Sequence, residues 1–165
     1  MTKDRIVVGV EGSGGAIAAL RWAITEAGYR DATIEVVTAY LPTYVPAAPD
    51  FGFVSLDPID LNREVEKLQA RVIDSAIGDL GEPKVEIRRS LRKGRPADML
   101  IEASADADLL VVGDRGRGGF RGLLLGSVST QVSHHAKCPV VIVRRDLLDD
   151  ELTDGDTPVD GNDGD

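Results

Sequence analysis

The chain has 165 residues and a mass of 17.6 kDa, the size of one compact domain. A hydrophobic fraction of 42% allows a buried core, the single cysteine excludes a disulfide scaffold and a cysteine-based zinc site, and no apolar run approaches the length of a membrane span. The net charge of −9 comes entirely from residues 146–165, which hold nine acids and no base, so the neutral body of residues 1–145 offers no basic field to a nucleic acid.

Predicted strands and helices alternate along the body. In chain order we expect a strand at residues 5–11, a helix at 17–29, a strand at 33–39, a long loop at 41–58, a helix at 61–80, an edge strand at 85–91, a helix opening at Pro96, a strand at 108–113, a helix at 127–135 and a strand at 139–143. The first strand is almost continuously apolar, which is typical of a strand buried on both faces. The long loop contains four prolines and exceeds an ordinary connection, which indicates a functional flap or a mobile segment.

This alternation predicts an α/β fold with a doubly wound, five-stranded parallel sheet and helices on both faces. Right-handed crossovers favour the strand order 3-2-1-4-5, in which the winding reverses between the first and fourth strands. A ligand is expected at the carboxyl ends of these two strands, and both glycine-rich segments of the chain, residues 12–15 and 113–126, follow them. We expect a soluble, cytoplasmic domain over residues 1–145 and a disordered acidic tail over residues 146–165.

The segment after the fourth strand has the composition of a phosphate-binding loop. Six glycines between residues 113 and 126 allow the backbone to approach a ligand and turn its N–H groups toward one point. Gly126-Ser127 then opens a helix whose unpaired N–H groups and dipole attract an anion, with the Ser129 hydroxyl nearby. The loop also carries three arginines: Arg115, Arg117 and Arg121. The alternative interpretation is a flexible loop followed by an ordinary serine N-cap.

The spacing Gly113-x-x-Gly116, nine residues, Gly126-Ser127 resembles the nucleotide-binding signature of the universal stress protein family. Other features agree with the resemblance: VGVEGS at residues 8–13, ALRWA at 19–23, ADLLVVG at 107–113 and HHAKCPVVIVR at 134–144. The resemblance covers residues 3–145. It implies the doubly wound fold, a pocket for ATP with Mg²⁺, and a homodimer joined through the last strand, residues 139–144.

The resemblance also implies roles for individual residues. The phosphates would be held by Gly113, Gly116, Gly126, Ser127, Val128 and Ser129, with Arg115 and Arg117 as further phosphate partners; Gly9, Val10 and Glu11 would line the ribose side; and the backbone of Ala39 would meet the adenine.

Two positions depart from the family's pattern. Glu11 stands where the family usually carries Asp, and its extra methylene would press on the sugar or on a bound metal. Asp114 stands where a small hydroxyl residue is common, and it would add a carboxylate near the phosphates that weakens triphosphate binding.

Other sites find less support. No Gly-Lys-Ser/Thr occurs for a P-loop, and Ile17 takes the place of the third glycine of a dinucleotide fingerprint. No nucleophile and carboxylate are placed to converge on His134 or His135, so we expect no catalytic residues, no protein-held metal and at most slow ATP hydrolysis. The leading hypothesis is an ATP-binding regulatory protein of the stress response, read by an unknown protein partner. Two alternatives stay open: a dimeric interaction module that does not bind nucleotide, and a weak nucleotide-hydrolysing enzyme.

A basic cluster follows the predicted edge strand and includes Arg88, Arg89, Arg92, Lys93 and Arg95. Such a cluster is usually a solvated edge that charge protects against strand pairing. A docking site for the acidic tail is the alternative.

Overall fold

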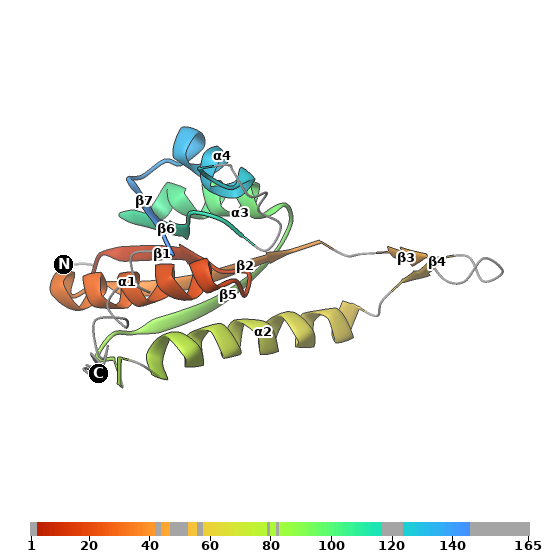
Figure 1. The fold of residues 1–165 in the computed structure, drawn as a ribbon, viewed down its shortest axis with the longest axis horizontal. Helices are drawn as coiled ribbons and strands as arrows, with labels where there is room; N and C mark the ends of the chain where they lie inside the picture. Colours follow the sequence, from red (N-terminus) through yellow and green to blue (C-terminus); the bar gives the residue numbers. More distant parts are fainter. Residues whose placement is uncertain are drawn as a thin grey trace, which may run out of the picture.

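The computed structural model describes residues 3–41, 44–46, 53–55, 58–78, 80–81, 83–116 and 124–145. Its main sheet has five parallel strands in the order β5-β2-β1-β6-β7 (Figure 1). The strands are β1 (Arg5–Gly9), β2 (Thr33–Tyr40), β5 (Ile87–Lys93), β6 (Leu109–Gly113) and β7 (Val140–Val143). Numbered within this sheet, the strands run 3-2-1-4-5, so the predicted topology is confirmed.

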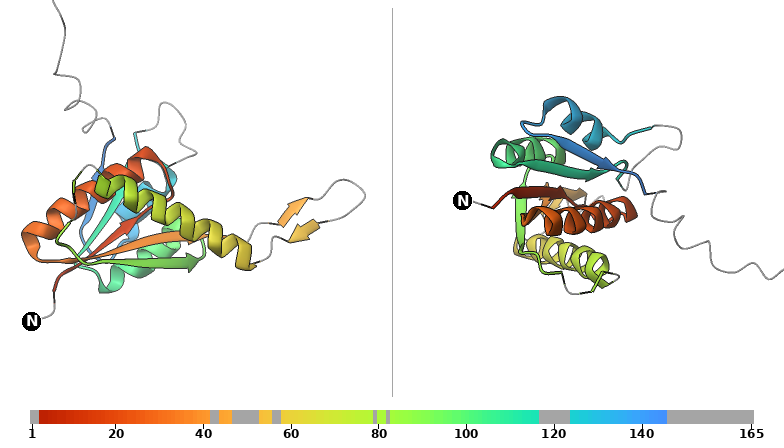
Figure 2. Two further views of the ribbon diagram at one scale, coloured as in Figure 1. Left: turned by 90° about the horizontal axis from the view of Figure 1, so that it is seen from below. Right: turned by 90° about the vertical axis from the view of Figure 1, so that its left-hand side faces the viewer.

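Two helices cover each face of the sheet, as the end-on view of Figure 2 shows. The helices are α1 (Gly14–Arg30) and α2 (Pro58–Gly78) on one face, and α3 (Pro96–Ala103) and α4 (Ser127–His135) on the other, with a short 3₁₀ turn, η1 (Ser104–Asp106), after α3. Within the described ranges, no helix has both the length and the apolar character needed to cross a bilayer.

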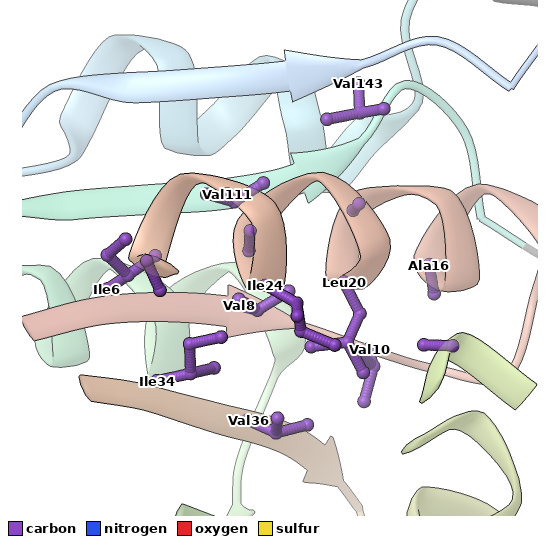
Figure 3. Close-up of a cluster of buried hydrophobic side chains, with 14 of the residues drawn as sticks. Ile6, Val8, Val10, Ala16, Leu20, Ile24, Ile34, Val36, Val111 and Val143 are labelled. Carbon is purple, nitrogen blue, oxygen red and sulfur yellow. The ribbon is translucent and has the colours of Figure 1, made fainter. Parts of the chain in front are cut away.

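Alternate residues of β1 belong to two separate cores. Ile6 and Val8 lie in the core beneath α1 and α2, together with Leu20 and other residues of α1 (Figure 3). Val7 belongs to the opposite core, together with Leu100 of α3. All three β1 side chains are fully buried, which explains why this strand is continuously apolar in the sequence.

The turn from β1 into α1 brings this helix close to the end of β6. Gly12 has a φ of 85°, a conformation that favours glycine, and the Ser13 hydroxyl accepts a hydrogen bond from the Ala16 N–H at 3.1 Å. A Cβ on Gly113 at the end of β6 would lie 2.8 Å from the carbonyl carbon of Gly15 in α1. The close packing of this helix on this strand therefore requires glycine at position 113.

The segment predicted as a long loop contains a short antiparallel ribbon, β3 (Tyr44–Pro46) and β4 (Phe53–Ser55). Aromatic and β-branched residues favour this pairing, and the prolines had argued against any strand here. Figure 2 shows the ribbon standing apart from the main sheet, beyond the amino end of α2. The other residues of the predicted loop lie mostly outside the described ranges.

A buried amide fastens α2 to the sheet. Gln69 is fully buried, and its amide nitrogen donates to the carbonyl oxygen of Val36 at 2.9 Å, to the hydroxyl of Thr38 at 3.1 Å and to the carbonyl oxygen of Ser90 at 3.1 Å. Its amide oxygen accepts from Arg89 at 3.2 Å. The network joins α2 to both β2 and β5, so it fixes the position of the helix along these strands.

Three arginines of the basic cluster, Arg88, Arg89 and Arg92, have partners within the body. Glu35 on β2 receives hydrogen bonds from Arg5 on β1 and Arg92 on β5, and Arg88 pairs with Glu86 at 2.8 Å. Burial raises the pKa of the Glu35 carboxyl, but the hydrogen bonds and charges of the two arginines together hold it below its ordinary 4.5. These pairs support the interpretation of a charged, protected edge. The acidic tail, residues 146–165, lies outside the described residues.

Candidate functional site

A cavity of about 370 Å³ opens at the carboxyl ends of β1, β2 and β6, where the winding of the sheet reverses. It is lined by Gly9, Val10, Glu11, Val37, Ala39, Pro96, Leu100, Val112, Gly113, Arg115, Gly116, Leu125, Gly126, Ser127, Val128 and Ser129. These residues come from three strands, from α3 and α4, and from the loops that follow β1 and β6. The cavity therefore lies where the predicted topology places a ligand.

One part of the cavity wall is apolar. Val37 and Ala39 of β2, Pro96 and Leu100 of α3, and Val112 of β6 contribute aliphatic surface to it. Such a wall suits a flat, apolar group such as a nucleobase.

Gly9 keeps this wall open at the end of β1. A Cβ at this position would lie 2.7 Å from the Cδ1 atom of Leu100 and 3.3 Å from the Cγ1 atom of Val112. Any side chain here would displace Leu100, so glycine allows β1 and α3 to approach each other beside the cavity.

The opposite part of the cavity is polar and includes the N-terminus of α4. Gly126 is the N-cap residue and has no side chain to satisfy the first N–H groups of the helix. Ser127, the first helical residue, is exposed and lines the cavity, as do Val128 and Ser129. Open backbone N–H groups and the positive end of the helix dipole together suit an anion such as a phosphate.

Backbone contacts of Asp114 hold this helix terminus in place. The Asp114 carbonyl oxygen accepts from the Gly126 N–H at 2.7 Å and from the Ser129 hydroxyl at 2.8 Å. The Ser129 hydroxyl also lies 3.1 Å from the Gly126 carbonyl oxygen, and Ser129 is buried. The Ser129 hydroxyl is thus used within the protein, whereas Ser127 is an exposed residue of the cavity lining.

The side chain of Asp114 does not line the cavity, which differs from the expected extra carboxylate near the phosphates. It is almost fully buried, and its Oδ1 atom would lie 3.7 Å from a Cβ on Gly15, in the first turn of α1. That turn contains no acidic residue of its own, so the carboxylate is placed where a helix dipole favours negative charge. Arg115 pairs with the same carboxylate at 3.5 Å.

Glu11 does line the cavity, and one of its oxygens has no partner among the described residues. The Oε1 atom is enclosed and receives no hydrogen bond from them. A Cβ on Gly116 would lie only 3.3 Å from this oxygen, so the carboxylate lies against the loop that follows β6.

The structure brings together eleven of the twelve residues to which the sequence assigned binding roles: Gly9, Val10, Glu11, Ala39, Gly113, Arg115, Gly116, Gly126, Ser127, Val128 and Ser129. The twelfth, Arg117, lies outside the described residues. Sequence reasoning missed Val37, Pro96, Leu100, Val112 and Leu125. Apolar residues are typical of a protein core, so nothing in the sequence pattern marked these positions as part of the site.

The other candidate groups lie away from the cavity lining. His134 and His135 end α4 and are exposed, and no group of three metal-ligating side chains occurs in the described part of the chain. Cys138 packs against the core beneath α3 and α4. Burial, and then the charge of Asp108, raise the pKa of its thiol, which makes it a poor nucleophile near neutral pH.

Comparison with known proteins decides the family. The family model described as the universal stress protein family matches residues 3–144. The chain belongs to the universal stress protein family. A curated universal stress protein of Mycolicibacterium smegmatis is 38% identical over 149 residues, and one of Mycobacterium tuberculosis is 33% identical over 143 residues. These matches cover 88% and 87% of this chain but 49% of each relative, so the chain spans about half the length of the curated relatives it matches.

Solved universal stress proteins share the fold. A universal stress protein in complex with cAMP is 27% identical, with a TM-score of 0.64 over 88% of this chain and 99% of its own. A universal stress protein family protein from Arabidopsis thaliana with AMP bound is 20% identical, with a TM-score of 0.55 over 92% of this chain and 97% of its own. The second likeness bears on the fold alone.

Proposed function

We propose that this universal stress protein binds an adenine nucleotide in the cavity between β1 and β6 and acts as a nucleotide-dependent regulatory protein in a stress response. The observation that carries the proposal is the pairing, within one cavity, of an aliphatic wall with an uncapped helix N-terminus. A base would pack on Val37, Ala39 and Leu100, and a phosphate would meet the first N–H groups of α4. The similar structure in complex with cAMP supports an adenine nucleotide as the ligand.

ATP with Mg²⁺ is one member of this ligand class. The described residues contain no group of three side chains that could hold a metal, and Glu11 is the single carboxylate among those lining the cavity. Magnesium commonly binds through one or two carboxylates together with substrate phosphates. Glu11 could supply one ligand, and the remaining ones would come from the nucleotide and water.

In the proposed role, a partner protein recognises whether nucleotide is bound, and the chain itself hydrolyses ATP slowly at most. Among the residues lining the cavity, Glu11 and Arg115 are the ionisable ones, and Arg115 is paired with Asp114.

We also propose a homodimer through residues 139–144. A dimeric module that does not bind nucleotide is the second candidate, and its motivation is that the longer carboxylate of Glu11 lines the cavity where the family usually carries aspartate.

The proposal is tested by calorimetric titration of the nucleotide-stripped full chain with AMP, cAMP, and ATP with magnesium. We expect at least one to bind with a Kd on the order of micromolar. Ala39→Leu, which fills the aliphatic part of the cavity, should weaken that binding at least about tenfold. The matched control is Ala105→Leu at an exposed position of η1, which should bind like the natural chain. Absence of binding by the natural chain, or equal affinity in Ala39→Leu, would contradict the proposal.

A further inference from the structure

Glu11 places a negative charge at the polar part of the cavity. It is the second residue after β1, and its carboxylate lies against the loop after β6, because a Cβ on Gly116 would come within 3.3 Å of Oε1 and 3.6 Å of Cδ. The same loop leads to the N-terminus of α4, where Gly126 lies. The carboxylate therefore lies in the part of the cavity that suits phosphates.

Nothing in the described part of the protein neutralises this oxygen through a hydrogen bond. Glu11 Oε1 is enclosed without a donor, and Arg115, the cation that lines the cavity, pairs with the buried carboxylate of Asp114 instead. The cation that lines the cavity is therefore engaged by Asp114 rather than by Glu11.

An enclosed carboxylate oxygen without a donor is costly, and a ligand can relieve or increase the cost. A ligand hydroxyl that donates to Oε1, such as a ribose hydroxyl, relieves it. Each additional phosphate brings more negative charge into the same confined space, where water screens the repulsion poorly. Aspartate at this position would hold its charge one methylene farther from the Gly116 loop.

We propose that Glu11 determines which nucleotide this site accepts: it favours an adenine nucleotide with one phosphate and disfavours ATP unless a divalent cation accompanies the triphosphate. The inference rests on the proposed function of the cavity. The first phosphate is stabilised by the N–H groups at the N-terminus of α4. The further phosphates of ATP gain little stabilisation there and are repelled by the carboxylate of Glu11. A divalent cation on the triphosphate offsets that repulsion.

The test compares calorimetric affinities for adenosine, AMP and ATP in buffer with EDTA, and for ATP with magnesium. The variants are Glu11→Gln, which removes the charge and keeps the size, and Glu11→Asp, which withdraws the charge. The matched control is Glu86→Gln, which removes an exposed carboxylate just before β5, at the opposite end of the sheet. Thermal unfolding establishes that each variant is folded, and Glu11→Asp carries the test if Glu11→Gln does not fold.

In the natural chain and in Glu86→Gln we expect AMP to bind at least about tenfold tighter than ATP in EDTA, and magnesium to reduce this ratio. In Glu11→Gln the ratio of AMP to ATP affinity should fall to about threefold or less, with Glu11→Asp between the two. Equal ratios in the natural chain and the Glu11 variants, or tighter ATP than AMP in the natural chain in EDTA, would overturn the inference and leave nucleotide binding intact. Failure of every nucleotide to bind any of the proteins would overturn the proposed function and this inference together.

Discussion

Gly113, the last residue of β6, and Gly126, in the loop after it, differ in what a side chain would meet. A Cβ on Gly113 would lie 2.8 Å from the backbone of Gly15, whereas a Cβ on Gly126 would meet its nearest atoms, the Cα of Arg115 and the carbonyl oxygen of Asp114, at 3.4 Å. Substitution of Gly113 therefore disturbs the packing of α1 on β6, and substitution of Gly126 changes only the mouth of the binding loop. Loss of binding in a Gly113 variant would not identify that residue as a phosphate ligand.

The two serines at the start of α4 provide a sharper test at the residue scale. Ser129→Ala removes a buried hydroxyl that bonds the Asp114 carbonyl oxygen, so we expect a loss of about 1 kcal/mol in the free energy of unfolding and weaker AMP binding, with adenosine affinity unchanged. Ser127→Ala removes an exposed hydroxyl, so it should weaken AMP binding without changing stability. Urea unfolding and calorimetry of both variants measure these effects. Unchanged stability of Ser129→Ala, or equal losses of adenosine and AMP affinity, would contradict a positioning role for Ser129.

The spacing of the glycines predicts from the sequence where the binding site lies. It does not predict in which direction each side chain of the site points. The helix that begins at Ser127 and the strand that ends at Gly113 follow from composition, and their meeting follows from the sheet order. Asp114 is the first residue after β6, and the sequence does not predict whether its side chain points to the cavity or, as observed, to the first turn of α1. The sequence therefore predicts where the site lies better than it predicts which groups touch the ligand.

At the scale of the elements, hydrophobic patterns predict which segments form helices and strands, but charged residues at the end of a strand make its boundary hard to predict. The predicted α4, residues 127–135, has the observed bounds because Gly126-Ser127 starts it and the chain before Pro139 ends it. The edge strand was predicted at residues 85–91 and is observed as Ile87–Lys93. Its charged end resembled a loop in the sequence, but Arg92 pairs with Glu35 on the neighbouring strand and the ladder continues through it. Partners distant in sequence decided this boundary.

The anchoring of α2 gives a prediction at this scale. Gln69→Leu keeps the volume of the side chain and leaves the Thr38 hydroxyl and the Ser90 carbonyl oxygen without their buried donor, so we expect the free energy of unfolding to fall by about 2 kcal/mol. Lys67→Leu places the same residue at an exposed position of the helix and should change stability by less than about 0.5 kcal/mol. Chemical denaturation of both variants measures the difference. Equal stabilities would show that the buried amide does not anchor the helix.

The whole sheet has two unlike edges. The β5 edge carries charged side chains such as Arg88, which protect a strand from pairing with another chain. The β7 edge is apolar: Val140, Val141 and Ile142 are only partly buried. Because the carbonyl oxygens of Pro139 and Val143 bond to β6 in a parallel ladder, the backbone groups of the alternate residues 140 and 142 point toward the open edge.

This asymmetry predicts that β7 is the strand through which two copies of the chain pair. Ile142→Lys places a charge on the edge strand in place of a partly buried apolar side chain, so we expect it to convert the proposed homodimer to a monomer while the sheet stays folded. Tyr29→Lys is the matched control, since it places a lysine at an exposed position on α1, away from β7. Light scattering coupled to size-exclusion chromatography gives the mass of each protein, and circular dichroism shows whether each is folded. A natural chain that is monomeric, or a folded Ile142→Lys variant that is still dimeric, would rule out pairing through this edge.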